Sequence, residues 1–393
     1  MIEDTETGAL RDGCYLKRLE EPVIYDAVKD AVYLVDEEAF ARILAMSQQG
    51  VADGEAATLL RRSGLFQGGA RRNAAVLAGC APTPSLRYLE VQVTARCDKA
   101  CRHCYQGSPS SRDMTAETLA RILDQFEVMQ GLKVMISGGE PLCHPRFTDL
   151  AGVLEGRVLR KVLITHGERI DGAAARSLKM FEQVQVSLDG WGGSHDSLRG
   201  PGSFRRAVAG IEALAAEGIP IGIATMVHRD NLGDFERMAR FLDGLDVCEW
   251  GIDVPCPAGR WGREETGDRH LMRAMVGRMS YAFGGGFHGG SEGLACGAHL
   301  MTVFPDGSAA KCGFFADEAA GGADHDLVAA WKMVWQISLA DLACDCDHVE
   351  ECAGGCRFRA RILTGDRLGP DPVQCMARGV EIKDRAGGGG KPG

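Results

Sequence analysis

The segment Cys97-Asp98-Lys99-Ala100-Cys101-Arg102-His103-Cys104 places three thiols directly after residues 89–93, an apolar run that we expect to be a strand. Three thiolates hold three irons of a 4Fe-4S cube and leave the fourth iron open to a ligand that is not protein. The alternatives are a zinc site or three buried thiols. Zinc sites usually pair one CxxC with a second CxxC or with two histidines, which the neighbouring sequence lacks, so the spacing favours the iron–sulfur cube.

Composition limits the classes of protein that this chain can form. Its 393 residues, 45% of them hydrophobic, suffice for one large core and one or two small modules. The net charge of −10 argues against nucleic acid as a main partner, because phosphate binding needs a basic face. No apolar stretch approaches the roughly 20 residues of a membrane span, and the acidic residues 1–6 lack a signal-peptide layout, so we expect a cytoplasmic protein.

The fifteen cysteines fall into three groups. Three belong to the segment above, and seven lie in the stretch from Cys296 to Cys375. In a chain without a signal peptide, such clusters indicate bound metal in a reducing compartment rather than disulfides. The other five are expected to be small buried apolar residues: Cys14, Cys80, Cys143, Cys248 and Cys256.

The chain divides into four parts. A helix-breaking linker, Ala81-Pro82-Thr83-Pro84, ends a first module at residues 1–80. In residues 81–285, β-branched runs alternate with helical patterns, which predicts an α/β fold with parallel strands, either an open sheet or a partial barrel. Residues 286–378 are cysteine-rich and strand-poor, and residues 379–393 form a flexible tail. The expected strands are 86–94, 134–137, 162–165, 184–188, 221–227 and 249–254, and the expected helices are 115–126, 147–154, 173–181, 204–216, 232–242 and 270–282.

A second motif, Ser137-Gly138-Gly139-Glu140-Pro141, ends the second of these strands. Sites in such folds lie at the carboxyl ends of the strands, where a glycine pair lets the backbone approach a ligand closely. One β/α unit after CxxxCxxC and Tyr105, this GGEP motif resembles the radical SAM family. The resemblance implies a partial (β/α)6 barrel, a 4Fe-4S cluster on Cys97, Cys101 and Cys104, and S-adenosylmethionine (SAM) whose amino group is held by Gly138, Gly139 and Glu140.

The fourth strand ends in a segment that resembles the SLDG motif of the same family, Ser187-Leu188-Asp189-Gly190. The resemblance implies that Ser187 and Asp189 face the SAM pocket, whereas an Asp-Gly turn is the structural alternative. Arg199 follows in a pattern frequent in the family and is expected to neutralise the SAM carboxylate. The alternative is an ordinary surface arginine.

The C-terminal cysteines resemble a SPASM domain, the extension that carries one or two auxiliary 4Fe-4S clusters. The resemblance implies two sets of ligands, with Cys296, Cys312 and Cys356 on the first cluster and Cys344, Cys346, Cys352 and Cys375 on the second. Because the region is poor in apolar residues, bound metal is expected to form its core.

Two features depart from the SPASM pattern. The usual CxxC is CxC here, Cys344-Asp345-Cys346, so either the turn is tighter or the ligation of the second cluster is altered. Two 4Fe-4S clusters contain eight irons, and seven cysteines leave one of these irons without a cysteine ligand. The first auxiliary cluster therefore has either an open iron or a ligand that is not cysteine. In the family's anaerobic sulfatase-maturating enzymes, an Asp follows the cysteine that matches Cys312, as the proton acceptor. Gly313 stands there, which argues against that activity.

The first module resembles a PqqD-like peptide-recognition element. Short strands at 14–19, 23–26 and 31–35 precede helices at 37–46 and 55–60. Such elements capture a leader peptide by adding it as a strand to their sheet. The alternative is a cap that only packs against the barrel.

These resemblances imply a radical SAM/SPASM enzyme that modifies a ribosomally made peptide with a 5′-deoxyadenosyl radical. The expected partners are a precursor peptide and an electron donor such as flavodoxin or ferredoxin, with neither nucleic acid nor a membrane. Crosslinks, epimers and decarboxylated side chains all stay open as products. One alternative is a SPASM enzyme acting on a small molecule, such as a tetrapyrrole or quinone precursor. Another is a non-catalytic iron–sulfur carrier, which would have no use for the GGEP motif.

Overall fold

A curved sheet of parallel strands forms the centre of the computed structural model, which describes residues 8–49, 54–68, 79–262, 268–284 and 293–381. The six strands of the barrel lie side by side in chain order, so each β/α unit adds the next strand in one direction. They are β6 (Tyr88–Thr94), β7 (Lys133–Gly138), β8 (Arg160–Thr165), β9 (Gln183–Ser187), β10 (Ile221–Met226) and β11 (Glu249–Asp253). The predicted fold class and all six strands are confirmed, each strand to within two residues at either end.

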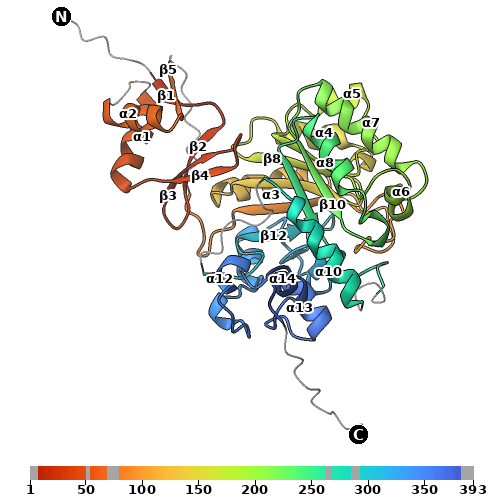
Figure 1. The fold of residues 1–393 in the computed structure, drawn as a ribbon. Coiled ribbons are helices and arrows are strands. Elements are labelled where there is room, and N and C mark those ends of the chain that lie inside the picture. Colours follow the sequence, from red (N-terminus) through yellow and green to blue (C-terminus); the bar gives the residue numbers. More distant parts are fainter. Residues whose placement is uncertain (1–7, 50–53, 69–78, 263–267, 285–292, 382–393) are drawn as a thin grey trace, which may run out of the picture.

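Helices cover the outer face of this sheet (Figure 1). They are α3 (Ala116–Val128), α4 (Phe147–Leu154), α5 (Gly172–Ser177), α6 (Gly193–Arg199), α7 (Ser203–Ala216), α8 (Phe235–Asp243) and α10 (Arg269–Arg278). The helix expected at 173–181 ends early, because Leu178 and Phe181 turn into the core. The sequence analysis missed α6, whose seven residues carry no apolar periodicity.

The C-terminal region joins the barrel sheet through two short strands. β12 (Leu300–Val303) pairs parallel with β6, and β13 (Ala309–Ala310) pairs antiparallel with β12. Four helices follow, α11 (Leu327–Met333), α12 (Val349–Cys352), α13 (Arg357–Thr364) and α14 (Pro372–Ala377). Apolar residues of this region, such as Trp331 and Val373, belong to the main core of the barrel. The expectation that metal forms the whole core of this region is therefore wrong for the part that packs on the barrel.

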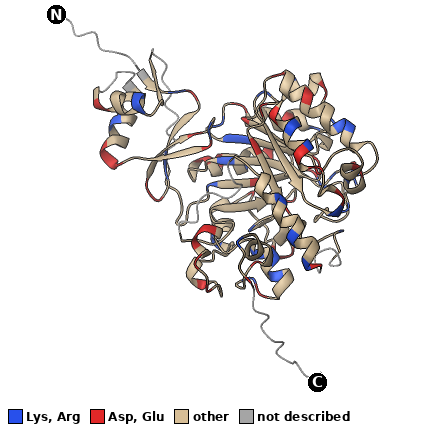
Figure 2. Cartoon of the chain, viewed as in Figure 1, with Lys and Arg blue, Asp and Glu red and all other residues tan. Residues whose placement is uncertain are grey.

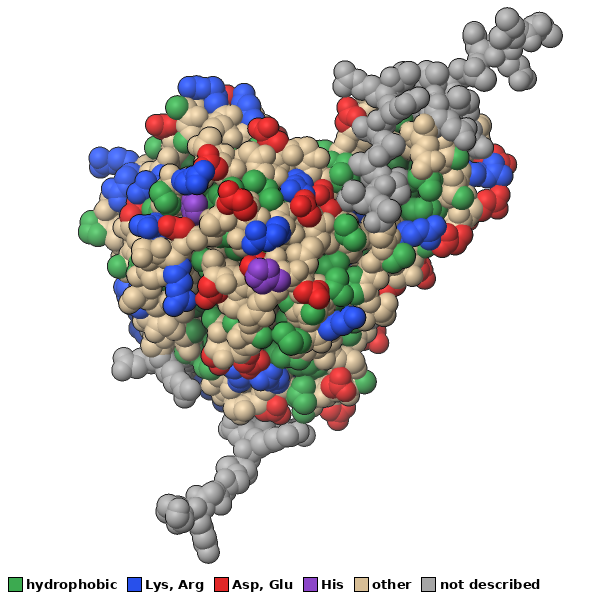
Figure 3. Space-filling model, turned by 180° about the vertical axis from the view of Figure 1, so that it is seen from behind, with side chains coloured by type: hydrophobic (Ala, Val, Ile, Leu, Met, Phe, Trp, Pro, Cys, Tyr) green, Lys and Arg blue, Asp and Glu red, His purple; other side chains and the backbone are tan. Residues whose placement is uncertain are grey.

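The N-terminal module has a core of its own. Its strands β2 (Cys14–Arg18), β3 (Pro22–Asp26) and β4 (Ala31–Leu34) form an antiparallel sheet in that order, and α1 (Glu37–Gln49) and α2 (Gly54–Arg62) follow, as expected. β1 (Gly8–Leu10) and β5 (Phe66–Gly68) form an additional antiparallel pair that the sequence analysis missed. Hydrophobic side chains are visible on this module and along its boundary with the barrel (Figure 3).

Buried polar contacts fix this module to the amino-terminal ends of the barrel strands. Lys17 Nζ donates to the carbonyls of Gly131 and Val158 at 2.9 and 3.0 Å. Asp30 pairs with Lys133, and Glu20 pairs with Arg87 at 2.8 Å. The module therefore lies at the end of the barrel opposite the carboxyl ends of the strands.

Charged residues of both signs are interspersed over the helices and loops (Figure 2). Among the described residues, no helix combines the length and the apolar character that a membrane span requires.

Candidate active site

A cavity of about 1430 Å³ opens at the carboxyl ends of the barrel strands and continues along their inner face. Its wall includes all three CxxxCxxC cysteines, the GGEP turn, Ser187, Asp189, Arg199 and several C-terminal cysteines. Typical small-molecule pockets occupy about 300–1,000 Å³, so this cavity has room for more than one ligand. The structure thus brings motifs from distant parts of the sequence to one site.

The CxxxCxxC loop is held by backbone contacts from two later segments. Leu198 O accepts from Arg102 N at 2.9 Å, and Arg260 Nε donates to Cys101 O at 2.8 Å. Arg260 N also donates to Cys104 O at 3.0 Å. These contacts position the loop against the end of α6 and the segment after β11.

The three thiols of this loop fit a 4Fe-4S cluster. Cys101 is buried, Cys97 and Cys104 are half-buried, and all three line the same cavity. Burial raises the pKa of the Cys97 thiol to about 12 and raises that of Cys101, so metal binding must displace the protons. Among the described side chains, no three Cys, His, Asp or Glu groups meet closely enough to hold a single metal ion. A four-iron cube, with its ligands spread around a larger body, does not require that they do.

The GGEP turn is clamped against the chain that enters the cysteine loop. Gly139 N donates to Thr94 O at 2.8 Å, and Glu140 N donates to Arg96 O at 2.7 Å. Gly138 has a φ of 147°, and a Cβ on Gly139 would lie 2.3 Å from Arg96 O. Both positions therefore require glycine for conformation or for space.

The carboxylate of Glu140 is fully buried and already satisfied by protein donors. It accepts from Leu142 N at 3.1 Å, Thr165 Oγ1 at 2.8 Å and His166 N at 2.9 Å. These bonds tie the GGEP turn to the end of β8. A direct contact of Glu140 with the SAM amino group stays a prediction.

We expect Gly139→Ala to weaken SAM binding by at least about tenfold, which corresponds to about 1.4 kcal/mol. The reason is that the added methyl group must push the turn away from Arg96 O. Isothermal titration of the reconstituted protein with SAM would measure the change. Gly152→Ala on α4 is the matched control, because a Cβ there meets no atom within 4 Å. Equal SAM affinity of the two variants would contradict this role of the turn.

Arg199 is buried and paired with Asp189, so its interpretation as a surface arginine is wrong. Asp189 Oδ1 also accepts from Met226 N at 2.7 Å. Burial alone would raise the pKa of Asp189, but Arg199 and His103 more than offset it, so this pKa lies well below its ordinary value. Burial lowers the pKa of His103 to about 4, so this histidine is neutral at pH 7. Together they place an ion pair and a neutral imidazole in the cavity wall.

The C-terminal cysteines form two spatial groups, and which of them would bind each auxiliary cluster stays a prediction. The thiols of Cys296 and Cys312 interact electrostatically with that of Cys356, and all three line the cavity. The thiol of Cys375 interacts with those of Cys344, Cys346 and Cys352. Both CxC cysteines lie in this second group, so the shortened spacing does not separate them.

The remaining five cysteines differ in their surroundings. Cys14 and Cys256 are buried, as expected. Cys143 is half-buried, and Cys80 and Cys248 are exposed, so the expectation of burial is wrong for these two. Both exposed cysteines lie in loops, Cys80 just before the Ala81–Pro84 linker and Cys248 just before β11.

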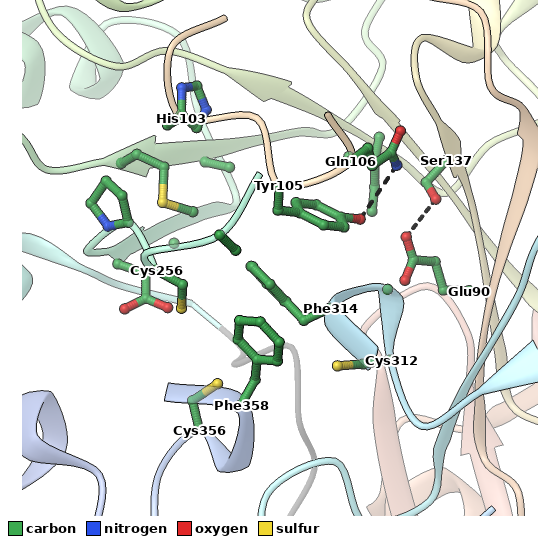
Figure 4. Close-up of a pocket in the computed structure, with 18 of the residues that line it drawn as sticks. Glu90, His103, Tyr105, Gln106, Ser137, Cys256, Cys312, Phe314, Cys356 and Phe358 are labelled. Carbon is green, nitrogen blue, oxygen red and sulfur yellow. Dashed lines mark hydrogen bonds between the residues drawn. The ribbon is translucent and has the colours of Figure 1, made fainter. Parts of the chain in front are cut away.

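Aromatic rings of Tyr105, Phe314 and Phe358 lie in the middle of the cavity, and the carboxylate of Glu90 lies beside them (Figure 4). Tyr105 stacks on Phe314 at 4.4 Å between ring centroids. A Cβ on Gly313 would lie 2.6 Å from the Tyr105 hydroxyl, so an Asp at this position would require Tyr105 to move. Glu90 on β6 accepts hydrogen bonds from Ser137 Oγ and from Thr302 Oγ1, each at 2.6 Å. Sequence analysis missed Glu90 because it looked like one polar residue in an apolar strand.

Comparison with known proteins gives the context of this site. Residues 91–242 match the family model described as Radical SAM superfamily. Over 322 residues, the chain is 30% identical to mycofactocin maturase MftC of Mycobacterium ulcerans, covering 72% of this chain and 86% of that protein. It is 29% identical over 185 residues to an AdoMet-dependent heme synthase of Oleidesulfovibrio alaskensis. That match covers 45% of this chain and only 48% of the heme synthase.

The fold is similar to that of a solved peptide complex. The structure of Streptococcus suis SuiB bound to precursor peptide SuiA superposes with a TM-score of 0.68 at 13% sequence identity. The superposition covers 93% of this chain and 99% of SuiB. At this identity the similarity concerns the fold, including the N-terminal module and the C-terminal region.

Proposed function

Because this chain belongs to the radical SAM superfamily of enzymes, we propose that it modifies a ribosomally made precursor peptide by abstracting an unactivated hydrogen atom. When bound, the 4Fe-4S cluster supplies the electron that cleaves SAM into methionine and a 5′-deoxyadenosyl radical. Cys97, Cys101 and Cys104 would hold that cluster, and the GGEP turn would hold the methionine part of SAM. The observation that carries the proposal is the single large cavity shared by these motifs and the C-terminal cysteines.

The C-terminal cysteines would hold two auxiliary clusters, and flavodoxin or ferredoxin would supply electrons. With three cubes of four irons each, the anaerobically reconstituted protein would contain about twelve irons. The similarity to proteins named peptide maturases supports a peptide substrate. The exposed edge strand β4 of the N-terminal module would bind the leader part of the precursor.

The similarity to a heme synthase favours a second candidate, a tetrapyrrole substrate in the same cavity. The two candidates differ in whether the N-terminal module is needed for recognition. A non-catalytic iron–sulfur carrier is the third, and cleavage of SAM would exclude it.

The test is to incubate the reconstituted enzyme anaerobically with SAM, a reductant and short precursor peptides encoded beside its gene. Mass spectrometry would follow the peptide, and chromatography would follow 5′-deoxyadenosine. We expect a mass change in the peptide together with 5′-deoxyadenosine formation. Unchanged peptides, together with turnover of a tetrapyrrole precursor, would overturn the peptide substrate.

Glu90 is the side chain best suited to accept the substrate proton in this cavity. Asp189 pairs with Arg199, and Asp253 pairs with Arg359. Both carboxylate oxygens of Glu90 instead accept hydrogen bonds from hydroxyl groups. It also lies near Tyr105, whose pKa is raised by burial and, to a smaller extent, by Glu90.

Glu90→Gln is expected to lower product formation by about tenfold while SAM affinity stays within about twofold. The effect is smaller than the ~10²–10⁴-fold of a dedicated base, because water in an open cavity can replace part of its role. The matched control is Glu117→Gln in the first turn of α3, outside the cavity. Product formation equal to that of the control would remove Glu90 from this role.

A further inference from the structure

Cys256 lies apart in sequence from the C-terminal cysteines but beside them in the fold. It follows the last barrel strand, β11, and is only 8% exposed. Its side chain packs with Phe315 and Phe358 in a small cluster that also contacts Cys312 and Cys356. In Figure 4, the sulfurs of Cys256 and Cys356 face each other, and that of Cys312 points into the same space. The thiols of Cys256 and Cys356 lie close enough to interact directly.

The surroundings of this group suit thiolates on a metal cluster. Arg359 N donates to Cys356 Sγ at 3.5 Å, and the buried guanidinium of Arg359 lies near both Cys256 and Cys356. Lys311 is buried on the other side, within electrostatic reach of Cys296 and Cys312. The guanidinium of Arg359, which also pairs with Asp253 and Asp371, the buried amine of Lys311 and a backbone amide therefore lie around four thiols. Such contacts around a cluster favour the deprotonated ligands.

We infer that Cys256 is the fourth protein ligand of the first auxiliary cluster, completing the set of Cys296, Cys312 and Cys356. On binding, the Cys256 thiol releases its proton to solvent, and its sulfur bonds the iron that the other three leave open. This inference rests on the auxiliary cluster of the proposed function. It removes the open iron from that cluster, so the cluster would pass electrons and would not bind substrate.

Ligation by Cys256 would also connect the first auxiliary cluster to the CxxxCxxC loop through one short segment of the chain. Cys256 belongs to the segment whose Arg260 holds the CxxxCxxC loop through Cys101 O and Cys104 O. A Cβ on Gly259 of this segment would lie 2.2 Å from Cys104 O, so the two chains are in close contact. The segment therefore spans from one cluster to the other in a few residues.

The test uses a background in which Cys97, Cys101 and Cys104 are all alanine, so that only auxiliary iron is bound. In this background we compare Cys256→Ala, Cys256→Ser and the control Cys248→Ala. Iron and sulfide content, EPR spectra after mild oxidation and the response to added cyanide are measured, with circular dichroism as a check on folding. The parent should hold about eight irons and show no response to cyanide.

We expect Cys256→Ala to produce the narrow EPR signal of a three-iron cluster on oxidation and a spectral shift with cyanide, or to lose about four irons. Cys256→Ser should be intermediate, and Cys248→Ala should match the parent. If the parent already responds to cyanide and Cys256→Ala changes nothing, the inference is wrong. A parent with no iron at all would instead overturn the auxiliary clusters of the proposed function.

Discussion

Replacing Cys97, Cys101 and Cys104 together by alanine is expected to abolish cleavage of SAM to 5′-deoxyadenosine. The three thiols line one wall of the cavity and would hold the only iron that has an open position for SAM. The C-terminal cysteines come from separate elements, so the variant should keep about eight of about twelve irons. Iron analysis and chromatography of 5′-deoxyadenosine measure the two effects.

The control for this variant is the double substitution Cys80→Ala and Cys248→Ala, because both cysteines are exposed and lie outside the cavity wall. It should keep full iron and full SAM cleavage. Unchanged cleavage in the triple variant would remove the radical assignment. Loss of all iron in the triple variant would overturn the auxiliary clusters of the proposed function.

The barrel could be predicted from the sequence because its strands and its motifs are both local signals. Parallel strands buried on both faces are largely apolar runs that contain β-branched residues, such as 162–165 in β8 and 221–226 in β10. CxxxCxxC and GGEP each sit within one strand and its following loop. Because each motif lies within one short segment, its spacing was enough to predict these residues as site residues.

Contacts between distant segments could not be predicted in this way. Cys256 precedes Cys296 by forty residues with no fixed spacing, and only the fold brings it beside Cys356. Arg199 looked like a surface residue because α6 is short and polar, yet the ion pair with Asp189 buries it. Glu90 is one polar residue among apolar neighbours, and its proposed role rests on contacts with hydroxyl groups from β7 and β12.

The ion pairs between the N-terminal module and the barrel make deletion of the module a poor test of its role in recognition. Deleting residues 1–80 would leave Arg87 and Lys133 without Glu20 and Asp30, at the ends of two core strands. Leaving charged groups without their partners is destabilising, so a truncated protein would test stability and recognition together. Substitutions on the exposed edge strand of the module test peptide recognition while these ion pairs stay in place.

β4 offers that edge, since it is the last strand of its sheet within the described part of the chain. Val35 N donates to Pro22 O of β3, so by the alternation of an antiparallel pair the amides of Val32 and Leu34 point away from β3. Their side chains are 42% and 71% exposed. A leader peptide added as a strand would accept hydrogen bonds from these two amides.

The double variant Val32→Pro, Leu34→Pro is therefore expected to lower kcat/KM for a full-length precursor by about a hundredfold. Each proline removes one outward donor, and two lost hydrogen bonds of about 1.4 kcal/mol each correspond to that factor. The loss should appear in KM, with kcat within about twofold, because chemistry takes place at the far end of the strands. SAM cleavage without peptide should stay unchanged.

The matched control is Val32→Thr, Leu34→Thr, which keeps both amides and changes only the side chains. The location of the module adds a second expectation. Strands of about six residues are about 20 Å long, so at least about six extended residues must separate the edge-bound leader from the modified residue. Precursors shortened below that length should behave like the proline variant. Equal modification of the precursor by the proline variant and the threonine control would show that the module is a cap that only covers the barrel. A small-molecule substrate would then become the better proposal.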